Sequence, residues 1–265
     1  MSRKTGTREW SEHSVNCCLG CRHGCLYCYG REAALRWGKI NRGEDWTTER
    51  VDVEAANRTR KKYAGRVMFP TVHDLTKGTA AACLATLVNL LDAENDVLVV
   101  SKAGLHVPAL LDTARSLAEG KGKLELRVSL TCLDGRIAAC WEPFAPSPRD
   151  RLAALIRANR ADFDTSVSIE PCLEPERVQE IVDAALDAEV KGEIWIGGAN
   201  LLRRRTAWIP DKRDLPLEWD ICRIEAGQTP EAMGRIYEAL NGNPQIRWKD
   251  SYQKVLGIDA KGAKA

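Results

Sequence analysis

Three cysteines close to the N-terminus are the residues of this chain best suited to chemistry. Cys21, Cys25 and Cys28 are separated by three and then by two residues, and the aromatic residue Tyr27 precedes the last of them. Thiolates are the usual ligands of iron–sulfur clusters. Three of them leave one iron of a 4Fe–4S cluster without a protein ligand, and an open position lets a metal centre bind a reacting molecule. The spacing therefore favours a three-cysteine cluster site.

A fourth thiol keeps a second interpretation open. Cys18 is separated from Cys21 by two residues, in the segment Cys18-Leu19-Gly20-Cys21. Together with Cys25 and Cys28 these thiols could form a closed zinc or iron–sulfur site. The chain would then be a non-enzymatic metal-binding protein. The secondary structure around the loop has to distinguish the three-cysteine cluster from the closed four-cysteine site.

The composition indicates a globular protein of a reducing compartment. A chain of 265 residues suffices for one large domain or two small ones, and its 44% hydrophobic and 29% charged content is ordinary. Five of the ten cysteines lie within residues 17–28 and the others are single, which is not the pattern of a disulfide framework. The polar start Met1-Ser2-Arg3-Lys4 predicts no signal peptide, and no apolar stretch is long enough for a membrane span. We expect a cytoplasmic protein without membrane association, whose oligomeric state stays open.

The net charge of +2 does not require a nucleic-acid partner. Two short basic runs, residues 58–62 and 203–205, could nevertheless bind a phosphate backbone, and Trp208 beside the second run could stack on a base. Ordinary solvated charge is the alternative. Nucleic acid is therefore one candidate substrate, with a peptide or a small metabolite as the others.

Strands and helices alternate along the chain. The periodicity predicts strands at 14–16, 66–69, 96–101, 124–130, 165–170 and 193–196, and helices at 80–92, 107–119, 149–159 and 175–188. This repeat implies a parallel sheet. No GxGxxG follows the first strand and no Walker motif occurs, which disfavours dinucleotide-binding and P-loop folds.

We therefore predict an α/β fold, a partial (β/α)6 barrel over residues 1–200 with a short C-terminal α/β extension over 201–265. The extension is expected to pack on the barrel, with helices at 229–240 and 251–256 and a strand at 246–248.

The cysteine loop and its neighbours resemble a known family. The run Gly20-Cys21-Arg22-His23-Gly24-Cys25-Leu26-Tyr27-Cys28-Tyr29 directly after the first strand resembles the radical S-adenosylmethionine (SAM) enzymes, most of all the spore photoproduct lyase or DNA repair photolyase-like branch. Asp74, Ser101-Lys102 and Ser129 at the ends of the next strands extend the resemblance. It implies a partial (β/α)6 barrel and an enzyme that cleaves SAM with a 4Fe–4S cluster. It also implies a flavodoxin- or ferredoxin-type reductant.

The resemblance assigns cofactor roles to residues in the loop and at the strand ends. Cys21, Cys25 and Cys28 would hold the cluster, and Tyr27 would pack near the adenine of SAM. Lys102, at the carboxyl end of a strand where ligands gather, would neutralise the SAM carboxylate.

Three further positions would complete the SAM site. Thr71, in the segment 70–72, would offer backbone groups to the SAM ammonium, and Ser129 would hydrogen-bond the ribose. Glu170 would contact SAM or substrate. A surface lysine at 102, a strand serine at 129 and a loop-capping glutamate at 170 are the structural alternatives.

One departure from the family concerns the hydrogen donor. Spore photoproduct lyase uses a cysteine in the loop after the second strand, but this chain has no cysteine between Cys28 and Cys83. Cys132 or Cys172, near the carboxyl ends of predicted strands, could substitute, and Tyr29 matches a tyrosine of the radical relay. The resemblance therefore implies SAM cleavage without implying photoproduct repair.

Overall fold

One parallel sheet organises the chain, and the computed structural model describes residues 5–209 and 217–264. The sheet has seven strands in the order β1-β4-β5-β6-β7-β8-β9, and every neighbouring pair is parallel. The strands are β1 (His13–Ser14), β4 (Val67–Met68), β5 (Asp96–Ser101), β6 (Lys123–Ser129), β7 (Asp164–Ile169), β8 (Ile194–Ile196) and β9 (Ile246–Trp248). Spatial order follows chain order, so each crossover advances by one strand. The sheet curls into a half-barrel, which confirms the predicted fold class.

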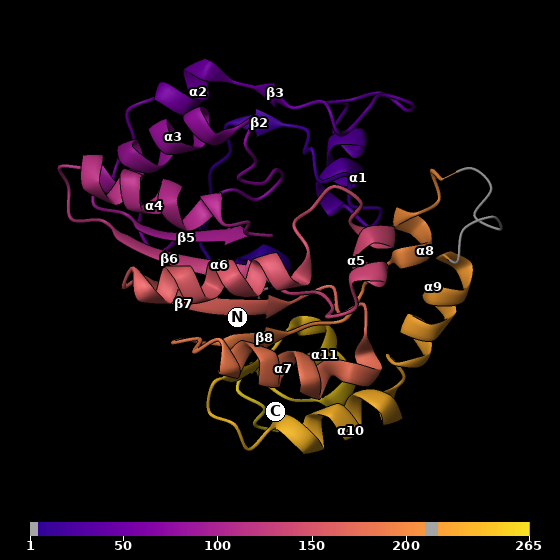
Figure 1. Cartoon of the computed structure of the whole chain (residues 1–265). Helices are drawn as coiled ribbons and strands as arrows, with labels where there is room; N and C mark the ends of the chain where they lie inside the picture. The colour runs from indigo at the N-terminus through magenta and orange to yellow at the C-terminus, as the bar shows by residue number, and fades with distance from the viewer. Residues whose placement is uncertain (1–4, 210–216, 265) are drawn as a thin grey trace.

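The crossover helices pack along the sheet (Figure 1). They are α3 (Ala80–Asp92), α4 (His106–Leu117), α6 (Pro148–Arg160) and α7 (Val178–Asp187), the last preceded by the short 3-10 helix η2 (Pro175–Arg177). The start of α6 is fixed by a capping box between Ser147 and Asp150, with Pro148 in the first turn. No helix in the described part of the chain is both long and apolar enough to cross a bilayer.

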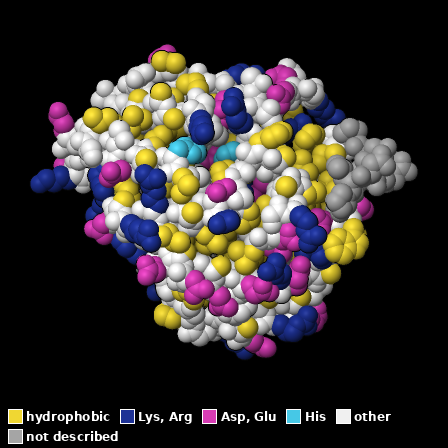
Figure 2. All heavy atoms as spheres, viewed as in Figure 1, with side chains coloured by type: hydrophobic (Ala, Val, Ile, Leu, Met, Phe, Trp, Pro, Cys, Tyr) yellow, Lys and Arg dark blue, Asp and Glu magenta, His cyan; other side chains and the backbone are white. Residues whose placement is uncertain are grey.

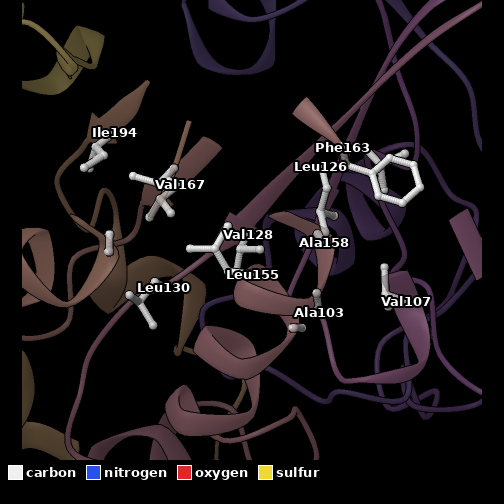
Figure 3. Packing of buried hydrophobic residues seen from close by; sticks show 14 of the residues in the cluster. Ala103, Val107, Leu126, Val128, Leu130, Leu155, Ala158, Phe163, Val167 and Ile194 are labelled. Carbon is white, nitrogen blue, oxygen red and sulfur yellow. The ribbon is translucent and has the colours of Figure 1, made fainter. Parts of the chain in front are cut away.

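The core lies between the sheet and these helices. Side chains alternate along β6, so Leu126 and Val128 point into the core while Arg127 points to the other side of the sheet. Figure 3 shows this packing, in which Val128 meets Leu155 of α6. Each such side chain, when fully buried, stabilises the fold by about 1.5–3 kcal/mol.

Short elements gather mainly at the end of the sheet toward which the strands point (Figure 1). The sequence did not predict most of them, because they are too short for a periodic signal. They are β2 (Cys18–Leu19), antiparallel to β3 (Arg50–Val51), and the helices α1 (Tyr29–Arg36), α2 (Val53–Asn57), α5 (Gly135–Trp141), α8 (Leu202–Arg205) and α9 (Leu217–Ala226).

The C-terminal extension joins the sheet. It contains α10 (Pro230–Leu240) and α11 (Asp250–Leu256), and its strand β9 pairs with β8 as the seventh strand, where the repeat count gave six. The division of the chain at residue 200 remains a prediction.

The segment before β1 packs against the far edge of the sheet. It contains the 3-10 helix η1 (Gly6–Glu9), and the polar Met1-Ser2-Arg3-Lys4 before it lies outside the described residues. Lys249, directly after β9, donates to the carbonyl of Gly6 at 2.8 Å and pairs with Glu9 at 2.7 Å. The ring of Trp10 lies 6.0 Å from that of Trp195 on β8. This segment therefore spans from the last strands of the half-barrel back to β1.

Candidate functional site

The cysteine loop lies at the carboxyl end of β1, between β2 and α1. At Gly20 φ is +97°, and a Cβ there would lie 2.2 Å from the carbonyl oxygen of Thr48, so only glycine fits. The amide of Cys21 donates to the carbonyl of Trp46 at 2.9 Å, and that of Leu26 to Trp141 at 2.9 Å. The loop is thus held between the segment before β3 and the end of α5.

Two of the three predicted ligands, Cys21 and Cys25, are largely buried, and Cys28 is half-buried. Cys21 is 9% exposed and Cys25 is 8% exposed. Burial and then the charges of Asp74, Cys25 and Cys28 raise the pKa of Cys21, and burial raises that of Cys25 to about 12. Thiols so close and so buried become thiolates readily only when a bound metal supplies the opposing charge. Three thiols on one ordered loop therefore fit the cluster implied by the family resemblance.

Cys18 belongs to a different environment. It lies on β2, and its thiol points to the carbonyls of Leu19 and Gly20 at 3.6 and 3.8 Å. Burial, followed by the charges of Glu49 and Cys17, raises its pKa to about 12. The strand pairing of β2 with β3 thus gives Cys18 a structural place apart from the three ligands.

Across residues 5–209 and 217–264, no group of three or more His, Cys, Asp or Glu side chains lies close enough to hold one metal ion.

Asp74 connects the loop to the ends of two strands. Its carboxylate accepts hydrogen bonds from the Ser101 hydroxyl and from the Lys102 amide at 3.0 Å, and it lies 3.2 Å from Nδ1 of His23. Burial alone would raise the pKa of Asp74, but His23, Lys102 and Ser101 hold it well below its usual range. This buried carboxylate fixes where Lys102 leaves β5.

Lys102 and Tyr27 meet at a buried carboxylate that the sequence did not single out. The Lys102 ammonium lies 3.9 Å from Oε1 of Glu142 and 5.5 Å from the centre of the Tyr27 ring. Glu142 accepts hydrogen bonds from the Tyr27 hydroxyl, from Arg151 and, at 2.9 Å, from the Thr131 hydroxyl. Burial alone would raise the pKa of Glu142, but Arg151 and Lys102 hold it below its usual value. The only sequence signal for Glu142 was its place at the end of an apolar run.

Thr71 and Ser129 lie at strand ends as predicted. The amides of Thr71 and Val72 both donate to the side-chain carbonyl of Asn16, at 2.8 and 3.0 Å. A ligand ammonium needs acceptors, so only the carbonyl groups of this segment are relevant to it. Ser129 is 8% exposed and lies opposite Ser168 of β7 in the sheet register. Their contacts with SAM remain predictions.

Glu170 and Tyr29 influence each other electrostatically. Glu170 follows β7, and its carboxylate is 3.4 Å from the ammonium of Lys249. Tyr29 begins α1 and is 41% exposed, yet burial of the remainder and the charges of Cys28 and Glu170 raise its pKa. The positive charge of Arg205 acts on both groups in the opposite direction. Tyr29, at the start of the helix after the cysteine loop, is therefore within electrostatic reach of Glu170 and Arg205.

Cys172 lies in the hydrophobic core and not at this surface. It is 3% exposed, and burial raises its pKa to about 12. Its proposed role as hydrogen donor stays a prediction.

Comparisons with known proteins place this fold. No family model matches the chain. An uncharacterized protein, ORF301 of Acidianus two-tailed virus, is 25% identical over 91% of this chain and 83% of its own length. A mutant of spore photoproduct lyase with bound AdoMet and dinucleoside spore photoproduct is similar with a TM-score of 0.50 and 16% identity, over 78% of this chain and 64% of that one. SuiB of Streptococcus suis bound to S-adenosylmethionine gives a TM-score of 0.53 and 12% identity, over 94% of this chain and 54% of SuiB.

The half-barrel with its cysteine loop after the first strand has the fold of radical SAM enzymes, as both solved neighbours do. The resemblance predicted from the sequence is thereby confirmed at the level of the fold. The chain spans less than two thirds of either neighbour, at 64% and 54%.

Proposed function

We propose that this protein is a radical SAM enzyme in which Cys21, Cys25 and Cys28 hold a 4Fe–4S cluster. The observation that carries the proposal is the placement of three interacting thiols, of which Cys21 and Cys25 are buried, at the carboxyl end of β1, with Lys102 near Cys25. When bound, the cluster supplies the electron that cleaves SAM to methionine and a 5′-deoxyadenosyl radical, which abstracts hydrogen from the substrate. A flavodoxin- or ferredoxin-type protein is the proposed reductant.

The residues of the chain bind and orient the SAM molecule. Lys102 offers a positive charge to its carboxylate, and the hydrogen bond of Tyr27 to Glu142 fixes the ring that packs near the adenine. Asp74 holds the Lys102 backbone in place. These contacts are formed by the protein itself, so the site is preorganised for the ligand.

For the substrate we propose a nucleic acid or one of its fragments. The solved lyase neighbour carries a dinucleoside photoproduct. Exposed aromatic side chains that could stack on bases lie on and beside α1: Tyr29 is 41% exposed, and Trp208, 43% exposed, stacks on Arg31 at 4.0 Å.

The basic runs give this substrate less support than their sequence indicated. Arg203 pairs with Glu225 at 2.8 Å and Arg204 with Glu32 at 2.6 Å, while Arg58 pairs with Glu54. Figure 2 shows acidic and basic side chains interspersed over the visible face. The aromatic residues near the loop therefore give the nucleic-acid substrate its main support, and a peptide or metabolite is the alternative.

Anaerobic reconstitution tests the enzyme proposal. The protein should bind iron and sulfide, absorb broadly in the visible range and release 5′-deoxyadenosine from SAM with dithionite. Stoichiometric zinc without SAM cleavage would contradict it. Salt-dependent binding of single-stranded DNA or RNA then tests the substrate class, and no binding at low salt would favour a peptide or metabolite.

A further inference from the structure

The three consecutive arginines of α8 differ in how their charges are satisfied. Arg203 makes hydrogen bonds to Glu218 and Glu225, the latter at 2.8–3.1 Å. Arg204 lies 2.6 Å from Oε1 of Glu32. Arg205 only approaches the same carboxylate, with Nε 3.7 Å from Oε2 of Glu32. Its Nε is buried and has no hydrogen-bond partner in the described structure. Arg205 is thus the member of the run with a buried N–H group that has no hydrogen-bond partner among the described residues.

Arg205 also lies where a substrate would approach the cysteine loop. Helix α8 follows the carboxyl end of β8, and Glu32, beside Arg205, is on α1 directly after the loop. The Arg205 side chain is 20% exposed, so it is partly withdrawn from water but reachable. Its charge acts on Tyr29 and on Glu170. The negative charge of Glu170 is offset by Lys249, whose ammonium lies 3.4 Å from the Glu170 carboxylate.

We propose that Arg205 binds an anionic group of the substrate, a phosphate or a carboxylate, at the carboxyl end of the half-barrel. A guanidinium presents its N–H groups in a planar fork that matches the oxygens of either anion. A guanidinium whose Nε lacks a hydrogen-bond partner is incompletely paired, and an anion at its reachable N–H groups would offset that cost. This inference rests on the proposed function and adds to it the charge that the substrate carries near the reacting centre.

The carboxylate of SAM is a second possible source of such an anion. Lys102 is the group near Cys25 and Tyr27, whereas Arg205 acts on Tyr29 and Glu170. We therefore assign the SAM carboxylate to Lys102 and the substrate anion to Arg205. Mutating each residue separately distinguishes the two sources.

Calorimetric titration of the anaerobically reconstituted full chain tests the assignment. The ligands are thymidylyl-thymidine for a phosphodiester, N-acetylglutamate for a carboxylate, thymidine as the uncharged reference, and SAM. The variants are Arg205→Gln, the matched control Arg203→Gln on the same helix, and Lys102→Met. Circular dichroism verifies that each variant is folded.

We expect Arg205→Gln to lower the affinity for one of the two anionic probes roughly tenfold or more, as the loss of a charged hydrogen bond predicts. Arg203→Gln should change the affinity for the same probe less than about twofold, since Arg203 belongs to an exposed surface ion pair. Thymidine and SAM affinities should not change in Arg205→Gln.

Three results would overturn the inference: neither anionic probe binds the native chain, the two arginine variants behave alike, or Arg205→Gln weakens SAM binding as much as Lys102→Met. Intact SAM cleavage with any of these results rejects the inference alone. Loss of probe binding in Arg205→Gln by a protein that never cleaves SAM would instead reject the proposed function.

Discussion

The ammonium of Lys102 lies 3.9 Å from a carboxylate oxygen of Glu142, a side chain with no exposed surface. The same carboxylate is hydrogen-bonded to Arg151, whose guanidinium is equally buried. Two cations therefore lie beside one anion, and the charge of Asp74 also acts on Lys102. Because 3.9 Å is longer than a hydrogen bond, the Lys102 ammonium can turn to another partner. Its positive charge suits it to the carboxylate of SAM.

Lys102→Met should weaken SAM binding by about tenfold or more, because the charge is lost while the length of the side chain is kept. Equilibrium dialysis of the reconstituted protein measures this SAM affinity. Iron content should stay unchanged, since Lys102 is not a cluster ligand. Unaltered SAM affinity would mean that another residue binds the carboxylate.

Glu142→Gln should destabilise the protein by about 3–5 kcal/mol, because it leaves Arg151 as a buried charge without its counter-ion. The matched control is Glu218→Gln, whose side chain is 49% exposed and pairs with the exposed Arg203, so the loss should be about 1 kcal/mol or less. Urea denaturation followed by tryptophan fluorescence compares the two. Equal losses would show that the buried network contributes little.

Cys21→Ala, Cys25→Ala and Cys28→Ala should each lose most of the reconstituted iron and the associated visible absorption. Cys18→Ala should retain both, because Cys18 points to backbone carbonyls on β2. Iron and sulfide analysis of the four variants measures how much cluster each one holds. A Cys18→Ala protein without iron would restore the closed four-cysteine site.

Gly20→Ala should lower both stability and iron uptake. The added Cβ meets the Thr48 carbonyl at 2.2 Å, while at Gly43, where φ is also positive at +90°, a Cβ meets nothing within 4 Å. Gly43→Ala therefore carries the backbone strain without the clash. Urea denaturation should give Gly20→Ala a free energy of unfolding about 1–3 kcal/mol lower than that of Gly43→Ala, as overpacking predicts. Equal stability of the two variants would show that the cysteine loop shifts to accept the added Cβ at little cost.

Stability should fall as the pH rises above the ordinary glutamate value of 4.5, because burial raises the pKa of both Glu9 and Glu170. In that window the folded state binds more protons than the unfolded state, so the slope of the unfolding free energy is negative, by at most about 1.4 kcal/mol per pH unit for each proton. Urea midpoints between about pH 4.5 and pH 7 measure it. Glu170→Gln should flatten the profile, and a rising native profile would show that other groups dominate.

Periodicity was sufficient for the long elements of the barrel. Helix α3 and strand β5 have the predicted bounds, because the alternation of apolar residues directly records which side chains are buried. The strand β9 was predicted as a segment, but its place as the seventh strand was not. Strand pairing depends on which edge remains free once the other strands have assembled, and no local pattern records that.

The sequence by itself determined the three-cysteine loop, the parallel half-barrel and the strand-end positions of Lys102, Ser129 and Glu170, since spacing and periodicity are local properties. Only the tertiary structure decided the partners of the charges. Tyr27 and Glu142 are 115 residues apart in sequence, yet they share a hydrogen bond. Arg203, Arg204 and Arg205 read as one basic run, yet they differ in their pairing. The sequence shows that a side chain is charged but not which groups lie next to it. Its role follows from the groups that folding brings within reach.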